Sequence, residues 1–416
     1  MNQQKHLLLA ITGSSPAVVT ETLYGINKRG DAWPDEIKII TTAYGEQKAW
    51  EGLHQAGHLQ ALCEMLDKPL IPFTRDDILV VPDANGQPVE DARSEEDHEA
   101  LANFIMAKVR DFTVDDYTSI HASIAGGRKT MTFYLGYAMS LFGRHHDCLS
   151  HVLVTEGYES SDFYYPTRDD QWFVGFKGQK LNAKEARVTL TDIPFIRQRS
   201  LVPELLKEVQ SHLNFRTLVD LVNLGEQPAR LVLHLHLKEQ RLDVMIKPGK
   251  SLLTSIHIAN PLHWALYVLI AEDSMKDKGQ RGNYPAPKNG KGNEDQLLAT
   301  ELLIKLNEIM DLKLNAKDGK EMLDKLLDDN RLWSEHASLY RGIQAFRNNN
   351  DGMSANNFSS YLTYLQNGMK SKLPKNLANC ILPKPLFNDD ESSPKVQGAG
   401  YGINLPDPKS QILIIR

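Results

Sequence analysis

Apolar and polar positions follow two different periods along roughly the first 165 residues of the chain. Short apolar runs, typical of buried strands, alternate with longer segments in which apolar residues recur every three or four positions, as on an amphipathic helix. The predicted strands cover residues 7–11, 36–42, 117–124 and 151–155, and the predicted helices cover residues 18–27, 47–66, 95–109 and 129–142. Strands that alternate with helices predict an α/β fold with a mostly parallel sheet and right-handed crossovers.

The pattern changes near residue 199. Residues 230–255 alternate apolar and polar positions around two turn-like segments, which predicts an antiparallel hairpin or small sheet. A buried helix is expected at 261–273, and the remainder is mainly helical up to Pro374. We therefore expect an α/β domain over 1–198, a small hairpin-and-helix region over 199–275, a flexible linker or loop over 276–293, and a helical domain over 294–416.

Composition narrows the classes of protein that fit this pattern. The chain has 416 residues, of which 41% are hydrophobic and 24% charged, as in a soluble globular protein. It offers no window of about 18 uninterrupted apolar residues, so no membrane partner is expected. Three isolated cysteines fit neither a disulfide framework nor a metal site, which favours a reducing cytoplasm. The net charge of −6 argues against nonspecific wrapping of nucleic acid, but leaves room for a local anion site.

Two turns follow predicted strand ends, where α/β sheets bind their ligands. The first turn, residues 12–16, offers the hydroxyls of Thr12, Ser14 and Ser15 together with Gly13 and Pro16. Proline suits the first turn of a helix, and the free amides of a helix N-terminus favour an anion. The residues fit two interpretations, an anion site or an ordinary N-capped turn.

The second turn, residues 126–130, combines paired glycines with two cations. Gly126 and Gly127 let the backbone approach a phosphate closely, while Arg128 adds a fork-shaped cation and Lys129 a point charge. Two cations at a helix N-terminus oppose the macrodipole at a cost of about 0.3–1 kcal/mol each, which a negative ligand would relieve. The four-residue spacer of a Walker loop is absent. A glycine turn with solvated basic residues remains the alternative.

The two turns and their surroundings resemble the CRISPR-associated ring nuclease family. The segments that carry this resemblance are residues 7–24, 39–45, 91–94 and 120–144, which occur in the family's order. The resemblance implies a CARF domain, a Rossmann-like sensor of the cyclic oligoadenylate made by type III CRISPR systems. It also implies a homodimer with one ring, expected to be cyclic tetra-adenylate, bound across the two-fold axis, since a symmetric ring fits an isologous interface.

The same resemblance implies a reaction and roles for individual residues. A ribose 2′-hydroxyl attacks the neighbouring phosphate without a metal or another cofactor. The family's serine corresponds to Ser15, with Ser14 as the near alternative, and its lysine corresponds to Lys129. The residues expected to hold the ring are Thr12 and Gly13 in the first turn and Gly126, Gly127, Arg128 and Thr130 in the second. Loops that are expected to reach the ring carry Thr42, Arg93 and Glu156.

The second half of the chain offers a ribonuclease motif as one rival. Relatives with a helical HEPN domain carry Arg, four residues, then His, and Arg331 and His336 have this spacing. Arg93 and His98 share it within the predicted α/β domain, where no such site belongs. A helix surface pair is therefore the plainer interpretation of Arg331 and His336, and a ring-activated ribonuclease is the functional one.

A winged helix-turn-helix is the other rival. Residues 357–369 form an amphipathic pattern, and residues 398–401 followed by 412–415 resemble the strand pair of a wing. Such a region would make the chain a transcriptional regulator gated by the ring, with DNA as partner. The small excess of basic residues near the C-terminus is a thin footprint for a duplex binder, so dimerisation or shielding of the ring fits a winged helix equally well.

Overall fold

The computed structural model describes residues 4–159, 162–175, 177–199, 214–276, 284–290, 292–386 and 400–416, without the side chains of Arg331, Trp333 and Glu335. The chain divides into two compact units. The first comprises Met1–Val202 with Gln210–Phe215, and the second comprises Pro203–Val209 with Arg216–Arg416. Among the described residues, no helix combines the length and apolarity needed to cross a bilayer.

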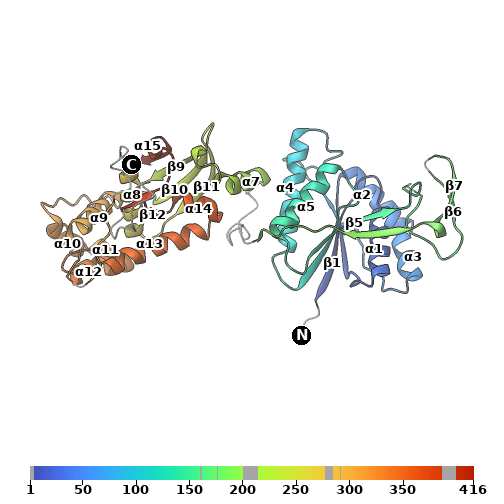
Figure 1. The fold of residues 1–416 in the computed structure, drawn as a ribbon, viewed down its shortest axis with the longest axis horizontal. Coiled ribbons are helices and arrows are strands. Elements are labelled where there is room, and N and C mark those ends of the chain that lie inside the picture. The colour runs from blue at the N-terminus through green and yellow to red at the C-terminus, as the bar shows by residue number, and fades with distance from the viewer. Residues whose placement is uncertain are drawn as a thin grey trace, which may run out of the picture. The chain divides into compact units, whose positions relative to one another are not determined.

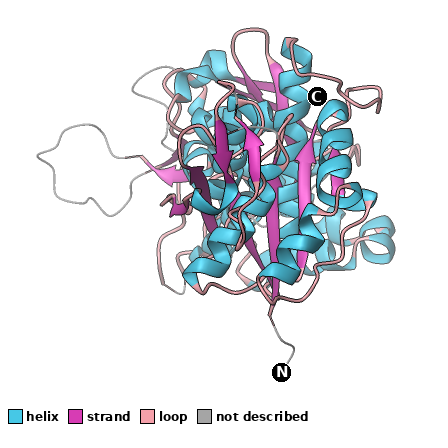
Figure 2. Ribbon diagram, turned by 90° about the vertical axis from the view of Figure 1, so that its right-hand side faces the viewer, coloured by secondary structure: helices cyan, strands magenta, loops and turns pink. Residues whose placement is uncertain are grey.

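The first unit is a sheet of six strands covered by helices (Figures 1 and 2). Its strands are β1 (Lys5–Ile11), β2 (Glu36–Thr41), β3 (Ile78–Val80), β4 (Thr118–Ser123), β5 (Cys148–Val154) and β8 (Val188–Asp192), with a separate pair, β6 (Trp172–Val174) and β7 (Lys180–Asn182). Its helices are α1 (Ala17–Arg29), α2 (Ala43–Ala49), the π-helix η1 (Trp50–Gln55), α3 (His58–Met65), the 3-10 helix η2 (Arg75–Asp77), α4 (Glu95–Phe112), α5 (Lys129–Phe142) and the 3-10 helix η3 (Ala183–Glu185).

The strand order, β3-β2-β1-β4-β5-β8, fixes where a ligand fits best. The first five strands of this order run parallel, and only β8 is antiparallel to its neighbour β5. The chain starts at β1, winds outward to β3, and then returns to β4 on the other side of β1. That reversal is a topological switch point, where the loops after β1 and β4 diverge to opposite faces. The predicted α/β fold is thereby confirmed.

Helices cover both faces of this sheet. Helices α4 and α5 pack together on one face, and α1 packs near α3 and β8 on the other (Figure 1). Strand β1 lies between them, and Leu8, Leu9 and Ile11 are fully buried in it. Each such side chain stabilises the fold by about 1.5–3 kcal/mol relative to leaving it exposed. A strand buried on both faces reads as a continuous apolar run, and β1 does so from residue 7 to 11.

One prediction for this unit is wrong, because a helix predicted to be continuous is broken in the structure. The pattern of residues 47–66 predicted a single helix, whereas the structure has α2, η1 and α3 in succession. The break lies at Gly57, whose φ of 74° is left-handed, a conformation that ends helices. Apolar periodicity continues across this break, because the segments on both sides pack into one core.

The second unit is built on a four-stranded sheet in the order β11-β10-β9-β14. Strands β9 (Leu231–His236), β10 (Arg241–Ile246) and β11 (Ser251–His257) form the predicted antiparallel sheet, and β14 (Ile412–Ile415) runs parallel to β9. A separate antiparallel pair joins β12 (Pro383–Pro385) to β13 (Tyr401–Ile403). The hairpin region and the end of the chain therefore share one sheet.

Helices surround this sheet and its central helix α8 (Pro261–Ser274). Nearly every side of α8 is buried, as expected for a helix that is apolar all round. The other helices are α7 (Phe215–Leu224), the 3-10 helix η5 (Pro228–Arg230), α9 (Gln296–Ile309), α10 (Gly319–Leu327), α11 (Asn330–Glu335), α12 (Ala337–Asn348), α13 (Ala355–Lys370), α14 (Lys375–Ile381) and α15 (Pro408–Gln411). Within the predicted linker 276–293, Tyr284 is only 4% exposed and bridges to Tyr401.

The predicted strand pair of a wing is wrong. Residues 412–415 pair with β9, while residues 401–403 pair with β12. The buried side chain of Gln411 explains this choice, because its amide donates to the carbonyls of Pro228 and Leu231 and anchors the chain beside β9. Residues 398 and 399 of the predicted wing lie outside the described residues.

Candidate functional site

The two turns singled out in the sequence lie side by side at one end of the first sheet. Strands β1 and β4 are parallel neighbours, with Ala10 opposite Ser123. The first turn (residues 12–16) and the second turn (residues 126–130) therefore leave the same edge, at the switch point. Each leads into a helix of more than three turns, α1 and α5, and neither helix has an acidic residue in its first turn.

The glycines of the second turn are required by its packing against the first strand. A Cβ atom at Gly126 would stand 2.6 Å from the carbonyl oxygen of Ile11, and one at Gly127 would overlap the Ile11 side chain. Gly127 also has φ of 77°, which favours glycine. A Cβ on Gly13 would come within 3.4 Å of the Gly127 Cα atom. The two turns thus touch through their backbones.

A third turn, after β2, completes the edge. The Thr41 hydroxyl donates to the carbonyl of Thr12 over 2.8 Å, which ties the end of β2 to the first turn. Thr42, 8% exposed, precedes α2, and the next amide, of Ala43, donates to the carbonyl of Val89. That last bond brings the segment around residue 91 to the same edge.

An ion triad links this segment to the second turn. Asp91 accepts from Arg128 Nε over 2.8 Å and from Arg93 Nε over 2.9 Å. Hydrogen bonds from Arg128 first, and then from Arg93, hold the pKa of the Asp91 carboxyl below its ordinary value. Because the triad is exposed, it contributes little to stability, but it does orient two guanidinium groups at the edge.

These groups surround a pocket of about 540 Å³, called the switch-point pocket below. Seven of the predicted residues line it, namely Thr12, Gly13, Ser14, Thr42, Arg93, Gly127 and Arg128. The Oγ1 atom of Thr12 is buried there without a hydrogen-bond partner in the described part of the chain. Hydroxyls, backbone and guanidinium groups from three turns and from the segment around residue 91 therefore converge on one cavity.

Four predicted residues of the first and second turns do not line the pocket. Ser15 is exposed beside Ser14 on the first turn, and Lys129 is exposed as the first residue of α5. Gly126 packs against β1 instead, and Thr130 approaches His98 Nδ1 with its Oγ1 at 3.3 Å. All four flank the lining residues along the same two turns.

The pocket also has lining residues that the sequence analysis did not assign. These are Tyr44, Glu90, Asp91 and Met131. Tyr44, Asp91 and Met131 fall inside segments that carry the family resemblance, so that signal was available for them. The contact of Asp91 with Arg128 depends on the path of the chain from 81 to 94, which residue spacing does not reveal. Tyr44 is 52% exposed and offers a ring at the rim.

The ribonuclease pair of the second unit is described only in part. His336 precedes α12 as its N-cap and is exposed. The side chain of Arg331, in α11, lies outside the description, so the distance between the two side chains is not defined. Among the described residues, no group of three or more His, Cys, Asp or Glu side chains is arranged to hold a metal ion.

Comparison with known families gives one result. A family model described as CRISPR-associated protein NE0113 (Cas_NE0113) matches residues 15–223. The matched segment begins within the first turn and includes the second turn, the ion triad and the whole sheet from β2 to β8. No curated protein sequence matches the chain.

Proposed function

The chain belongs to the CRISPR-associated protein NE0113 family, and from that premise we propose that its first unit is a CARF-type sensor that binds cyclic oligoadenylate and opens the ring. One observation carries the proposal. The switch-point pocket brings the hydroxyls of the first turn and the guanidinium of the second turn to the same cavity. A ribose phosphate can form hydrogen bonds with both kinds of group.

The charges around the pocket suit a phosphate that competes with Asp91. Arg128 presents a fork of donors that matches a phosphate as well as a carboxylate. In the free protein Asp91 occupies that fork, and a phosphate of the ring would take its place. Arg128 and Lys129 also stand at the positive end of α5, where an anion relieves the repulsion between these cations and the helix dipole.

A homodimer would complete the site. A ring of repeated nucleotides has rotational symmetry, and a two-fold pair of identical pockets matches it. Phe133 lies one turn after Lys129 on α5 and is 62% exposed, so apolar surface is available beside the pocket. Burial of the Phe133 side chain against a second copy of the chain would place the two switch-point pockets near a common axis.

The proposed reaction uses the ligand's own nucleophile. The 2′-oxygen of one ribose attacks the adjacent phosphorus, the bond from phosphorus to the 5′-oxygen breaks, and the proton of the 2′-hydroxyl passes to that leaving oxygen. The products are a 2′,3′-cyclic phosphate and a 5′-hydroxyl, and no metal is required. Ser14 or Ser15 would orient the attacking hydroxyl, while Lys129 would stabilise charge on the phosphorane-like transition state.

Incubation of the full-length chain with labelled cyclic tetra-adenylate in excess chelator tests the proposal. We expect linear products that end in a cyclic phosphate. An intact ring that changes the mobility of DNA would instead indicate a regulator. RNA cleaved only when the ring is present, and left whole by Arg331→Ala, would indicate a ribonuclease. A ring that stays intact in these experiments would overturn ring opening as the function.

A pair of serine variants then separates the two hydroxyls. Ser14 lines the switch-point pocket and Ser15 does not. We therefore expect Ser14→Ala to slow ring opening more than Ser15→Ala, with similar binding of the intact ring by both. The reverse order would assign the orienting role to Ser15, as the family resemblance implies.

A further inference from the structure

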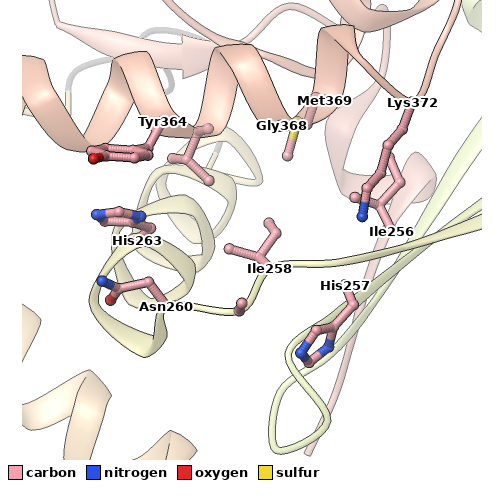
Figure 3. A pocket seen from close by; sticks show the side chains of 11 residues that line it. Ile256, His257, Ile258, Asn260, His263, Tyr364, Gly368, Met369 and Lys372 are labelled. Atoms are coloured by element: carbon pink, nitrogen blue, oxygen red, sulfur yellow. The ribbon is translucent and has the colours of Figure 1, made fainter. Parts of the chain in front are cut away.

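The second unit holds a cavity of about 430 Å³ between the chain that leads from β11 into α8 and the last turns of α13 (Figure 3). We call it the α13 pocket. Its apolar wall is formed by Ile256, Ile258, Leu365 and Met369. This volume falls within the range of about 300–1,000 Å³ that is typical of small-molecule sites, which combine an apolar lining with a few polar groups.

Gly368 in α13 faces this cavity, although no packing contact within the described chain requires a glycine at this position. Gly368 lies inside the helix, two residues before its end, and glycine is the least favourable residue there apart from proline. A Cβ atom at this position would meet no other atom within 4 Å, so packing within the chain does not require glycine. Close approach of a ligand to the helix backbone is a purpose that glycine serves.

Unused hydrogen-bonding groups border one side of the cavity. His263 is 9% exposed and stacks on Tyr364, with ring centroids 5.0 Å apart. Its ring nitrogens have no hydrogen-bond partner among the described residues, and burial lowers its pKa to about 4. The neutral ring therefore offers one donor and one acceptor. The side-chain oxygen of Asn260 caps α8, where it accepts a hydrogen bond of 2.9 Å from the backbone amide of Leu262. The side-chain NH₂ group of Asn260 has no partner among the described residues.

A single cation borders the other side. Lys372 is partly buried and forms no ion pair with any described residue. Figure 3 shows its side chain beside Ile256, across the cavity from His263 and Tyr364. None of the described residues that line the cavity is acidic. A partly buried charge without a partner is unfavourable, so an anionic group is the natural complement at this end.

We propose that the α13 pocket binds a nucleotide. Its base would lie flat against the helix at Gly368, with polar edge atoms toward His263 and Asn260, and its phosphate would pair with Lys372. A free mononucleotide and the terminal nucleotide of a single strand share this chemistry. The inference is independent of ring binding by the first unit, because all the residues that carry it belong to the second unit.

Calorimetric titration of the full-length chain tests this site. The probes are the four ribonucleoside 5′-monophosphates, their nucleosides, and a 5′-phosphorylated RNA tetranucleotide. We expect at least one monophosphate to bind, and its nucleoside to bind about ten-fold more weakly. RNA that binds more tightly than every monophosphate would identify a strand end as the source, whereas equal or weaker binding would identify the free nucleotide.

Variants assign the binding to this cavity. Gly368→Leu places an apolar side chain in the cavity, at a position where an added Cβ atom would meet no other atom within 4 Å. We expect at least about ten-fold weaker binding, with a thermal unfolding temperature no lower than that of the parent chain, because leucine is a better helix former than glycine. Lys372→Gln should weaken binding about ten-fold. Lys370→Gln, an exposed lysine at the end of the same helix that does not line the cavity, is the matched control and should bind as the parent does. Arg128→Ala, in the switch-point pocket, should also retain full affinity.

Three results would overturn the proposal. The first is that no monophosphate and no RNA binds at millimolar concentration. The second is that Gly368→Leu binds the nucleotide as tightly as the parent chain. The third is that affinity falls with Arg128→Ala and not with Lys372→Gln, since the bound nucleotide would then occupy the first unit.

Discussion

The switch-point pocket and the α13 pocket differ in how their charges are arranged. In the first, Asp91 accepts hydrogen bonds from Arg93 and Arg128 in an ion triad, so both guanidinium groups have an internal partner before any ligand enters. In the second, Lys372 and the imidazole of His263 have no polar partner among the described residues. A ligand of the first pocket must displace an internal partner, whereas a ligand of the second supplies a missing one. The first pocket therefore favours ligands that replace the contacts of Asp91, which makes it selective among anions. The second pocket requires only an anionic group that pairs with Lys372.

Replacement of Lys129 should have the largest effect among these variants, and that effect should be confined to the switch-point pocket. If Lys129 stabilises charge that develops only in the transition state, Lys129→Ala should slow ring opening about 100-fold and weaken ring binding far less. Nucleotide binding at the α13 pocket should not change. Single-turnover rates and equilibrium affinities of the same samples check this. Equal losses in rate and affinity would mean that Lys129 only binds the ring.

One buried group in each unit, Glu21 in the first and His263 in the second, should change the stability of its unit with pH in opposite directions. Burial, with a smaller contribution from Glu159, raises the pKa of Glu21 to about 7. The folded first unit therefore retains a proton that the unfolded chain loses above pH 4.5, and its stability falls as pH rises toward 7. Burial lowers the pKa of His263 to about 4, so the second unit loses stability as pH falls from 6.5 toward 4.

Two substitutions isolate these effects. Relative to the parent chain, Glu21→Gln should increase the free energy of unfolding of the first unit by about 2–3 kcal/mol more at pH 8 than at pH 5. His263→Gln should reduce the acid sensitivity of the second unit by a similar amount. Hydrogen exchange of peptides from α1 and α8 follows each unit separately. His121, whose pKa burial also lowers to about 4, acts against Glu21 in the first unit, so the difference between parent and Glu21→Gln is the quantity to measure.

A glycine pair tests whether close packing of the turns builds the switch-point pocket. Gly127 and Gly30 have nearly equal φ values, 77° and 74°, but only at Gly127 would a Cβ overlap another residue. Gly30→Ala should cost about 1 kcal/mol of folding stability from backbone strain alone. Gly127→Ala should cost about 1–3 kcal/mol more, because Ile11 must shift, and should weaken ring binding as well. Equal losses in thermal unfolding would show that the contact between the turns is not required.

The smallest predicted effect concerns Asp91. Since the ring must displace this carboxylate from Arg128, Asp91→Asn should tighten ring binding by about two- to five-fold, the range expected for an exposed ion pair. Asp192→Asn, which removes an exposed partner of Arg29 elsewhere in the unit, is the matched control and should leave affinity unchanged. Weaker binding by Asp91→Asn would show instead that the triad prepares the arginines for the ring.

The sequence predicted the first pocket better than the second for a physical reason. Parallel strands bring the turns after β1 and β4 to one edge, so two local motifs sufficed to place Ser14, Gly127 and Arg128 together. The α13 pocket joins residues near 260 to residues near 370, about 100 positions apart, through the packing of α13 on α8. No local motif marks such a contact.

The same limit explains the errors. Strand β14 joins β9 across about 180 residues, so its pairing could not be inferred from its neighbours along the chain. The predicted wing paired residues 412–415 with residues 398–401 because the two segments resemble the strand pair of a wing, and that local pattern carries no information on the distant strand β9. Asp91 was overlooked for a related reason, since an exposed acidic residue in a loop is ordinarily solvated and only the fold brings it to Arg128.

Ring binding at the switch-point pocket is tested most directly by titration of labelled cyclic tetra-adenylate into the full-length chain and its Arg128→Ala variant. The proposal predicts saturation at one ring per two chains for the parent, and at least about ten-fold weaker binding by the variant. Absence of binding to the parent, or equal affinity of the two proteins, would contradict it.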